Sequence, residues 1–336
     1  MRNPQGPLVI LPVGVVGCGR MGRLHARTYA QMPHTRLVGV FDAISKAAET
    51  MASEFGTKVV AHLDELAEMV SAVTIAVPTE HHAKAAEPFL KRGLACLIEK
   101  PLAKDSAEGK QIVQMAARHG AMLQVGHIER FNPAVVALAK LNLSPRYLDA
   151  LRVSPLPFRS LDVGVVLDVM IHDIDIVLSL IKSPVKRVDA VGVSVIGGVE
   201  DICNARLTFE NGCVANLTAS RLALKTERKL RVFCPDAYVS IDYQKKTGVI
   251  AHRNENVDAI RSAVESLRQG QGEAKNFADL VKLTPLAVED VDQIRAELEA
   301  FVGSIRQKQE PVVSGEQGLA AVELAERIVS EVAASQ

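Results

Sequence analysis

Three side chains near the middle of the chain have the types and spacing that proton transfer requires. Asp168, His172 and Asp175 follow one another at intervals of four and three residues within a long apolar segment. Residues at these intervals share one face of an α-helix, so the segment predicts a carboxylate–imidazole–carboxylate stripe. An apolar stripe beside it consists of Leu167, Ile171, Ile174 and Leu178. A histidine oriented by an acid is a typical general acid or base.

Two other interpretations of this stripe are considered. The first is a solvated helix face with an incidental histidine, which the apolar surroundings disfavour. The second is a zinc or manganese site, because aspartate and histidine bind both metals. No cysteine or further histidine lies close by in the sequence, so we predict no metal.

The second chemical candidate is Lys100, which stands in Glu99-Lys100-Pro101 directly after a short apolar run. A cation at a strand end can donate a hydrogen bond to a substrate hydroxyl or to a developing oxyanion. A lysine alone in such a place would more simply be a surface residue. The peptide bond before a proline can be cis, which would suit a sharp turn here.

A glycine turn near the start of the chain predicts a dinucleotide site. The apolar run 8–16 leads into Gly17-x-Gly19-x-x-Gly22, and a helical pattern follows. In this fingerprint Gly17 permits a tight turn, Gly19 lets the backbone approach a pyrophosphate, and Gly22 lets the helix pack closely. The helix start then attracts phosphate. The alternative is a glycine turn in another kind of α/β protein.

An acid at the end of the second strand supports the same site. Asp42 lies twenty residues beyond Gly22 and closes the extended run 36–42. A carboxylate there accepts hydrogen bonds from a ribose diol. It would also repel a 2′-phosphate, so NAD is predicted over NADP. The alternative is that Asp42 only caps the next helix.

Alternating strands and helices position these residues. The predicted strands are 8–16, 36–42, 58–61, 72–77, 95–98 and 121–125. The predicted helices are 24–30, 45–55, 63–70, 80–92 and 107–119. Such alternation predicts a doubly wound parallel sheet, whose ligands lie at the carboxyl ends of its strands. Those ends carry Thr79, Glu99, Lys100, Gly126 and His127.

The pattern changes after residue 128. Helix 134–141, strand 146–153 and a long helix at 163–181 precede successive strands between 185 and 252, with a hairpin signal at Glu210-Asn-Gly212. No helix separates those later strands, which favours an antiparallel sheet. Two helices, 290–307 and 314–331, close the chain, and residues 268–284 resemble a mobile loop.

The predicted fold class is therefore α/β, with an N-terminal doubly wound parallel (Rossmann) domain and a C-terminal α+β domain with a largely antiparallel open sheet. We place the dinucleotide-binding domain at residues 1–128. The substrate-binding and oligomerisation domain takes 129–336, and its last helices can pack back on the first domain.

Composition narrows the class of protein. The 336 residues carry 39 Lys+Arg and 39 Asp+Glu, which favours neither nucleic acid nor an anionic membrane. The five cysteines form no CxxC pair, as in proteins of a reducing compartment. No apolar run is long enough for a bilayer. We expect a cytoplasmic protein.

Four motifs occur in an order that resembles a known family. They are Gly17-Cys-Gly-Arg-Met-Gly22, Val77-Pro-Thr-Glu-His-His-Ala83, Glu99-Lys-Pro-Leu102 and Asp168-x-x-x-His172-x-x-Asp175. Together they resemble the glucose–fructose oxidoreductase / inositol dehydrogenase / rhizopine catabolism (Gfo/Idh/MocA) family of NAD(P)-dependent sugar and polyol dehydrogenases. The resemblance spans nearly the whole chain, although Met170 replaces a usual glycine.

The resemblance implies the residues of the site. It makes Lys100, Asp168 and His172 the catalytic group, in which either Lys100 or His172 is the base. The cofactor-binding residues that we expect are Gly17, Gly19, Arg20, Met21, Gly22, Asp42, Pro78, Thr79, His82, Glu99 and Lys100. The substrate-binding residues that we expect are Lys100, His127, Arg130, Asp168, His172 and Asp175.

Two segments carry a narrower resemblance. Residues 126–133 and 169–175 are similar to bacterial UDP-N-acetylglucosamine 3-dehydrogenases of lipid A biosynthesis, which oxidise the sugar 3-hydroxyl to a ketone. The arginines that could clamp a diphosphate are Arg130, Arg152, Arg159 and Arg221.

The expected function is hydride transfer between a nucleotide sugar and NAD, with the sugar between the strand ends and the antiparallel sheet. The alternatives are an inositol or aldose dehydrogenase of the same family, and a redox-silent nucleotide-sensing regulator. We expect a homo-oligomer, because the exposed face of an antiparallel sheet commonly binds a partner.

Overall fold

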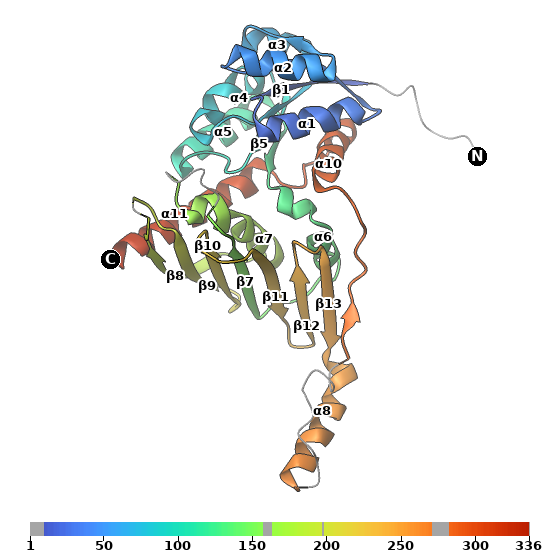
Figure 1. Cartoon of the computed structure of the whole chain (residues 1–336), viewed down its shortest axis with the longest axis vertical. Coiled ribbons are helices and arrows are strands. Elements are labelled where there is room, and N and C mark those ends of the chain that lie inside the picture. Colours follow the sequence, from blue (N-terminus) through green and yellow to red (C-terminus); the bar gives the residue numbers. More distant parts are fainter. Residues whose placement is uncertain (1–9, 157–162, 197, 271–281, 336) are drawn as a thin grey trace, which may run out of the picture. The chain divides into compact units, whose positions relative to one another are not determined.

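The computed structural model describes residues 10–156, 163–196, 198–270 and 282–335 (Figure 1). The chain divides into two compact units. The first unit consists of Met1–Phe131 and Val291–Glu326, and the second of Asn132–Asp290 and Arg327–Gln336. The start of the first predicted strand, Arg159 and most of the predicted 268–284 loop lie outside the described residues.

A six-stranded parallel sheet forms the framework of the first unit, with the order β3-β2-β1-β4-β5-β6. Its strands are β1 (Leu11–Val16), β2 (Thr35–Phe41), β3 (Lys58–Val59), β4 (Ala72–Ile75), β5 (Ala95–Glu99) and β6 (Leu123–Gly126). Every residue of β4 and β5 is buried, as in a sheet covered by helices on both faces. The strand order reverses between β1 and β4, which is where doubly wound sheets bind ligands.

Helices from both ends of the chain cover this sheet. They are α1 (Arg20–Gln31), α2 (Ser45–Phe55), α3 (Leu63–Met69), α4 (His82–Leu90), α5 (Ser106–His119), α10 (Gln293–Gln307) and the first part of α11 (Gly315–Ala334). Tyr29 of α1, Met51 of α2 and Phe301 of α10 belong to one buried core with β1 and β2. The penultimate helix α10 is therefore part of the nucleotide-binding unit.

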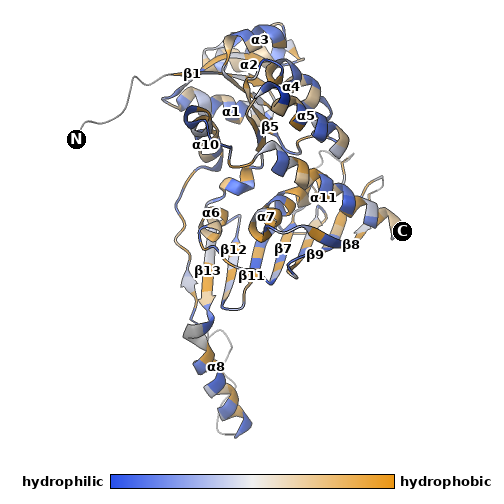
Figure 2. Cartoon of the chain, turned by 180° about the vertical axis from the view of Figure 1, so that it is seen from behind, coloured by the Kyte–Doolittle hydropathy of each residue, from blue (hydrophilic) through white to orange (hydrophobic). Residues whose placement is uncertain are grey.

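An eight-stranded sheet forms the framework of the second unit, with the order β14-β13-β12-β11-β7-β10-β9-β8. Its strands are β7 (Tyr147–Val153), β8 (Val185–Val193), β9 (Ile202–Phe209), β10 (Val214–Ser220), β11 (Glu227–Phe233), β12 (Ala237–Asp242), β13 (Thr247–His252) and β14 (Thr284–Pro285). Burial alternates along β7, β9 and β12, as in a sheet with one face packed on helices, which holds for the described part of this unit. The alternation of hydrophobic and hydrophilic residues is visible in Figure 2.

This sheet confirms the predicted largely antiparallel topology with one exception. Strands β7 and β10 pair in parallel. The predicted antiparallel pairing holds within β8–β10 and within β11–β13, and β7, which precedes the long helix in the sequence, lies between β10 and β11. A helix between two strands allows a parallel pairing that a hairpin does not.

The helices of the second unit are α6 (Pro133–Ala139), a π-helical turn (Val166–Met170), α7 (Ile171–Ile181) and α8 (Arg253–Arg268). Helix α6 packs on β12 and β13, and α7 packs on β7 and β10. The sequence analysis missed α8, although Val257, Ile260, Val264 and Leu267 have helical spacing. None of the helices in the described ranges is long and apolar enough to cross a membrane.

Candidate active site

The three glycines of the loop between β1 and α1 have different surroundings. Gly17 has φ +97°, and a Cβ atom there would lie 2.4 Å from the Ala76 carbonyl oxygen. A Cβ atom on Gly22 would lie 1.8 Å from the Gly17 carbonyl oxygen. A Cβ atom on Gly19 would have nothing within 4 Å. The fold thus requires Gly17 and Gly22, whereas Gly19 leaves an open surface at the start of α1, where a pyrophosphate can approach.

Asp42 joins the end of β2 to this loop. One carboxylate oxygen accepts a hydrogen bond from the Cys18 amide at 2.6 Å, and the other accepts one from the Ile44 amide at 2.8 Å. The side chain therefore joins the glycine loop to Ile44, the residue directly before α2, and the binding of a ribose diol by Asp42 stays a prediction. Burial and the Asp42 charge raise the pKa of the Cys18 thiol to about 12, which keeps the thiol protonated.

A small pocket of about 340 Å³ lies beside the same loop. Its lining residues include Cys18, Arg23, Ile44 and Lys46. Arg23 forms an ion pair with Glu54 at 2.7 Å, and the largely exposed Lys46 contacts Glu49 at 3.7 Å. Arg20 and Met21, which we expect to contact the cofactor, are the first two residues of α1.

Helix α4 begins with a buried histidine whose ring contacts two backbone carbonyl groups. Pro78 and Thr79 follow β4, and the expected cofactor ligand His82 is 1% exposed. Its Nδ1 lies 3.0 Å from the Pro101 carbonyl oxygen, and its Nε2 lies 3.0 Å from that of Val77. Burial lowers the pKa of His82. The ring therefore bridges the backbone after β4 and the backbone after β5, and a contact of His82 with the cofactor stays a prediction.

Lys100 directly follows β5, is half-buried and forms a cis peptide bond with Pro101. The preceding residue, Glu99, is buried, and its Oε1 lies 3.0 Å from the His25 Nε2 atom. Its Oε2 accepts a hydrogen bond from the Lys100 amide at 3.3 Å. The Glu99 carboxyl group therefore lies between His25 and the Lys100 amide, and a contact of Glu99 with the cofactor stays a prediction.

The loop after β6 carries two expected substrate ligands. His127 is fully buried. Arg130 is half-buried, and its Nη2 donates a hydrogen bond to the Gln317 Oε1 atom at 3.2 Å. Arg130 is the one arginine of the suggested diphosphate clamp in the first unit.

The second unit presents the acid–histidine stripe. Asp168 lies in the π-helical turn, and His172 and Asp175 lie in α7. Asp168 and His172 are half-buried, whereas Asp175 is 3% exposed. Single π turns inside helices often mark functional sites. The structure therefore confirms a helix over most of the predicted range, but its first turn is π-helical. Asp168 and His172 are more exposed than Asp175.

Two arginines suggested for a diphosphate clamp are buried in ion pairs within the second unit. Arg152 of β7 donates to both carboxylate oxygens of Asp173, at 2.8 and 3.0 Å, and lies over the Tyr243 ring at 4.9 Å. Arg221 donates to Asp201 at 2.7 Å. Both guanidinium groups thus have buried carboxylate partners within the unit, and a diphosphate clamp that includes them stays a hypothesis. The sequence analysis missed Asp173, whose position in an apolar helix was the available signal.

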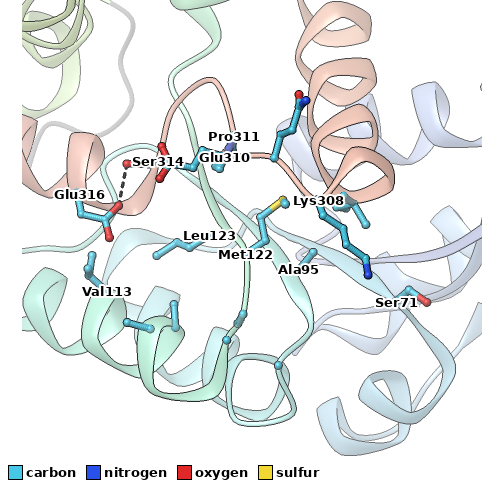
Figure 3. Close-up of a pocket in the computed structure, with 17 residues that line it drawn as sticks. Ser71, Ala95, Val113, Met122, Leu123, Lys308, Glu310, Pro311, Ser314 and Glu316 are labelled. Atoms are coloured by element: carbon cyan, nitrogen blue, oxygen red, sulfur yellow. Dashed lines mark hydrogen bonds between the residues drawn. The ribbon is translucent and has the colours of Figure 1, made fainter.

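A larger cavity, of about 580 Å³, lies at the amino ends of β5 and β6, away from the carboxyl ends that carry the predicted site residues (Figure 3). Ala95 begins β5, Met122 and Leu123 lie at the start of β6, and Lys308 and Glu310 belong to the connection after α10. None of the predicted site residues lines it. Doubly wound sheets bind cofactors at the carboxyl ends of their strands, so this cavity is not the dinucleotide site.

A doubly wound sheet, a glycine loop open at Gly19 and an acid at the end of β2 define a dinucleotide-binding protein. Comparisons with known proteins give the family. Residues 11–127 match the model described as oxidoreductase family, NAD-binding Rossmann fold, and residues 152–240 match the GFO/IDH/MocA C-terminal domain. The chain belongs to the Gfo/Idh/MocA family of oxidoreductases.

Named relatives support this membership. UDP-N-acetylglucosamine 3-dehydrogenase from Acidithiobacillus ferrooxidans is 37% identical over 290 residues, covering 86% of this chain and 89% of that protein. The solved structure of that enzyme has a TM-score of 0.87 at 33% identity, covering 97% and 98% of the two chains. Inositol 2-dehydrogenase from Rhizobium meliloti is 27% identical over 332 residues, covering 95% and 96%.

These matches confirm the predicted family, the fold class and the expectation of an NAD-dependent dehydrogenase. The roles of individual site residues stay predictions.

Proposed function

We propose that the protein oxidises the 3-hydroxyl of UDP-N-acetylglucosamine to a ketone, with NAD as the hydride acceptor. The observation that carries this proposal is the 37% identity, over 86% of the chain, to an enzyme named for that reaction. The open loop at Gly19 and the fixed carboxylate of Asp42 supply the nucleotide-binding features that the reaction requires.

The proposed chemistry divides among three side chains. His172 accepts the proton of the substrate hydroxyl, and Asp168 orients the imidazole. Lys100 donates a hydrogen bond to the same oxygen, which stabilises the charge that develops on it. NAD, when bound, accepts the hydride from the carbon, so the products are the ketone, NADH and one proton.

Cofactor preference follows from the end of β2. The carboxylate of Asp42 is held by two backbone amides. A ribose diol can donate hydrogen bonds to it, whereas a 2′-phosphate would be repelled. We therefore propose NAD as the working cofactor, with NADP a poor substitute.

A second candidate is inositol oxidation. It is supported by the match to inositol 2-dehydrogenase, which covers 95% of this chain but at 27% identity.

The location that we propose for the enzyme is the cytoplasm. This location is supported by the five free cysteines, three of which are buried, because free thiols are typical of a reducing compartment.

A substrate screen tests the proposal. Purified enzyme with NAD is mixed in parallel with UDP-N-acetylglucosamine, UDP-glucose, myo-inositol and glucose, and reduction of the nicotinamide is followed by absorbance. We expect the highest kcat/KM with UDP-N-acetylglucosamine. A higher value with inositol would favour the second candidate, and reduction with none of them would reject both.

A further inference from the structure

Three ionisable side chains from three separate elements are buried in the first unit, next to the end of β5 that precedes Lys100. They are His25 of α1, Glu99 of β5 and Glu297 of α10. His25 and Glu297 are fully buried, and Glu99 is 8% exposed. One nitrogen or oxygen atom from each residue lies within 4.8 Å of those from the other two. The proposed reaction assigns no role to His25 or Glu297.

Glu297 is the unusual member of this cluster. It lies on the apolar side of α10 next to Leu298, which belongs to the core shared with α1. Neither of its carboxyl oxygens has a hydrogen-bond donor among the described groups. An ionised carboxylate without donors is strongly disfavoured in such a place. Burial and the charge of Glu99 raise the pKa of Glu297 well above its usual range.

Among the described residues, the elements that pack on α10 place no hydrogen-bonded cation at this carboxyl group. Helix α1 brings His25 and Tyr29, whose hydroxyl is hydrogen-bonded to Thr74 at 3.0 Å. The short turn Ile128–Phe131, which also packs on α10, brings Glu129 and Arg130. The Arg130 guanidinium donates to Gln317. Glu99 is the charged group that acts on the protonation of Glu297.

Glu99 in turn connects the cluster to Lys100. Its Oε1 contacts His25 at 3.0 Å, and its Oε2 accepts the Lys100 amide at 3.3 Å. It pairs with Gly126 in the sheet, where an added Cβ would lie 3.1 Å from the Glu99 carboxyl group. The carboxyl group therefore has a defined place between α1, α10 and the backbone of the Lys100 turn.

We propose that Glu297 is a positioning residue for the Lys100 end of β5: as a neutral acid it shares its proton with Glu99 and holds that carboxylate between His25 and the Lys100 amide. Two close carboxyl groups in a dry site keep one proton between them, which leaves one negative charge beside the imidazole. The link to catalysis rests on the proposed role of Lys100.

Stability against pH tests the protonation. A group whose pKa is raised in the folded state loses its stabilising contribution as pH rises above the unfolded value, about 4.3 for glutamate. The side chain introduced by Glu297→Gln stays neutral at every pH. The urea unfolding midpoint of this variant should therefore rise steadily relative to that of the wild type between pH 5 and 8. The matched control is Glu299→Gln, because Glu299 is 52% exposed on the same helix and should give a constant difference. A constant difference for Glu297→Gln as well would overturn the proposal.

The Lys100 amide tests the positioning without any substrate. In protein labelled with ¹⁵N-lysine, the Lys100 resonance is assigned by its loss in Lys100→Arg. It should keep its position in Glu297→Gln and shift in Glu297→Leu, which lacks the donor. Equal shifts in both variants would overturn the proposal. One equivalent of divalent metal in the wild type, absent from Glu297→Gln, would also overturn it, because Glu297 would then be a ligand.

Activity adds a third readout. If Lys100 has its proposed role, Glu297→Gln keeps kcat and Glu297→Leu lowers it by about 10- to 100-fold, with NAD affinity unchanged. An inactive wild type would refute the proposed function alone, since the pH and amide measurements need no turnover. Equal kcat losses in Glu297→Gln and Glu297→Leu would overturn the positioning role.

Discussion

At the scale of single residues, the glycine loop shows how one motif combines structural and functional requirements. Gly17 and Gly22 are fixed by backbone atoms that an added Cβ would strike, but Gly19 faces open space. The sequence fingerprint identified all three, because the motif is local. It could not separate their roles, since the atoms that decide them belong to Ala76 and to the loop itself.

This difference predicts the outcome of two substitutions. Gly19→Val should fold with an unchanged unfolding midpoint and lose most of its NADH affinity, because the new side chain occupies the place of the pyrophosphate. Gly22→Val should be destabilised, because its Cβ would overlap the Gly17 carbonyl. NADH fluorescence titration and urea unfolding measure the two effects. Normal NADH binding by Gly19→Val would refute the loop assignment.

The candidate catalytic group gives a second prediction at this scale. Lys100→Ala and His172→Ala should each lower kcat by about 10²- to 10⁴-fold with little change in NAD affinity, because they act on the reacting hydroxyl. Asp168→Asn should cost less if it only orients His172. The two large losses should be non-additive, since both residues serve one transfer.

The pH profile of kcat/KM then identifies the base. The limb near neutrality should disappear in His172→Ala. Near wild-type turnover with the limb retained would exclude His172, and would assign the base to Lys100 if Lys100→Ala is inactive.

At the scale of elements, the sequence predicted features that depend on a local pattern. It did not predict features that depend on contacts between distant segments. Helix α2 was predicted at Ser45–Phe55, where it occurs, because hydrophobic periodicity lies within the segment. The π turn at Val166–Met170 was not predicted, because a helical pattern does not show one inserted residue. The contacts of Asp173 with Arg152, and of Glu297 with the His25–Glu99 pair, join distant segments. The sequence alone showed that Asp173 and Glu297 lie on apolar helices, but it did not show their partners.

The Arg152–Asp173 pair gives a prediction for the helix that carries His172. Arg152→Met leaves Asp173 buried without its partner and should cost about 3–5 kcal/mol of unfolding free energy. The double variant Arg152→Met/Asp173→Leu should recover much of this loss, since it removes both charges. Urea unfolding measures both. A single variant within about 1 kcal/mol of the wild type would contradict a stabilising role for the pair.

At the scale of the whole molecule, no described helix of the second unit covers the sheet face that carries Phe233. The Phe233 ring of β11 lies between those of Tyr147 (β7) and Tyr238 (β12), tilted by 51° and 50° with centroids 5.5 and 4.9 Å apart, and Phe233 is 38% exposed. Exposed aromatic rows are typical of protein interfaces. We expect this face to join two copies of the chain.

Phe233→Glu tests that expectation. It should shift the mass measured by light scattering from oligomer to monomer, because it places a charge in an apolar contact. The control is Val59→Glu, at a position of similar exposure, 43%, on β3 of the first unit, and it should leave the mass unchanged. A monomeric wild type would contradict the prediction.

The most direct test of the proposed function follows the hydrogen itself. UDP-N-acetylglucosamine carrying deuterium at C3 of the sugar is oxidised with NAD, and the reduced nicotinamide is examined by mass spectrometry. We expect NADH that contains one deuterium, and unlabelled NADH from the control substrate deuterated at C4. Unlabelled NADH from the C3-deuterated sugar, or deuterated NADH from the C4-deuterated one, would contradict oxidation at the 3-hydroxyl.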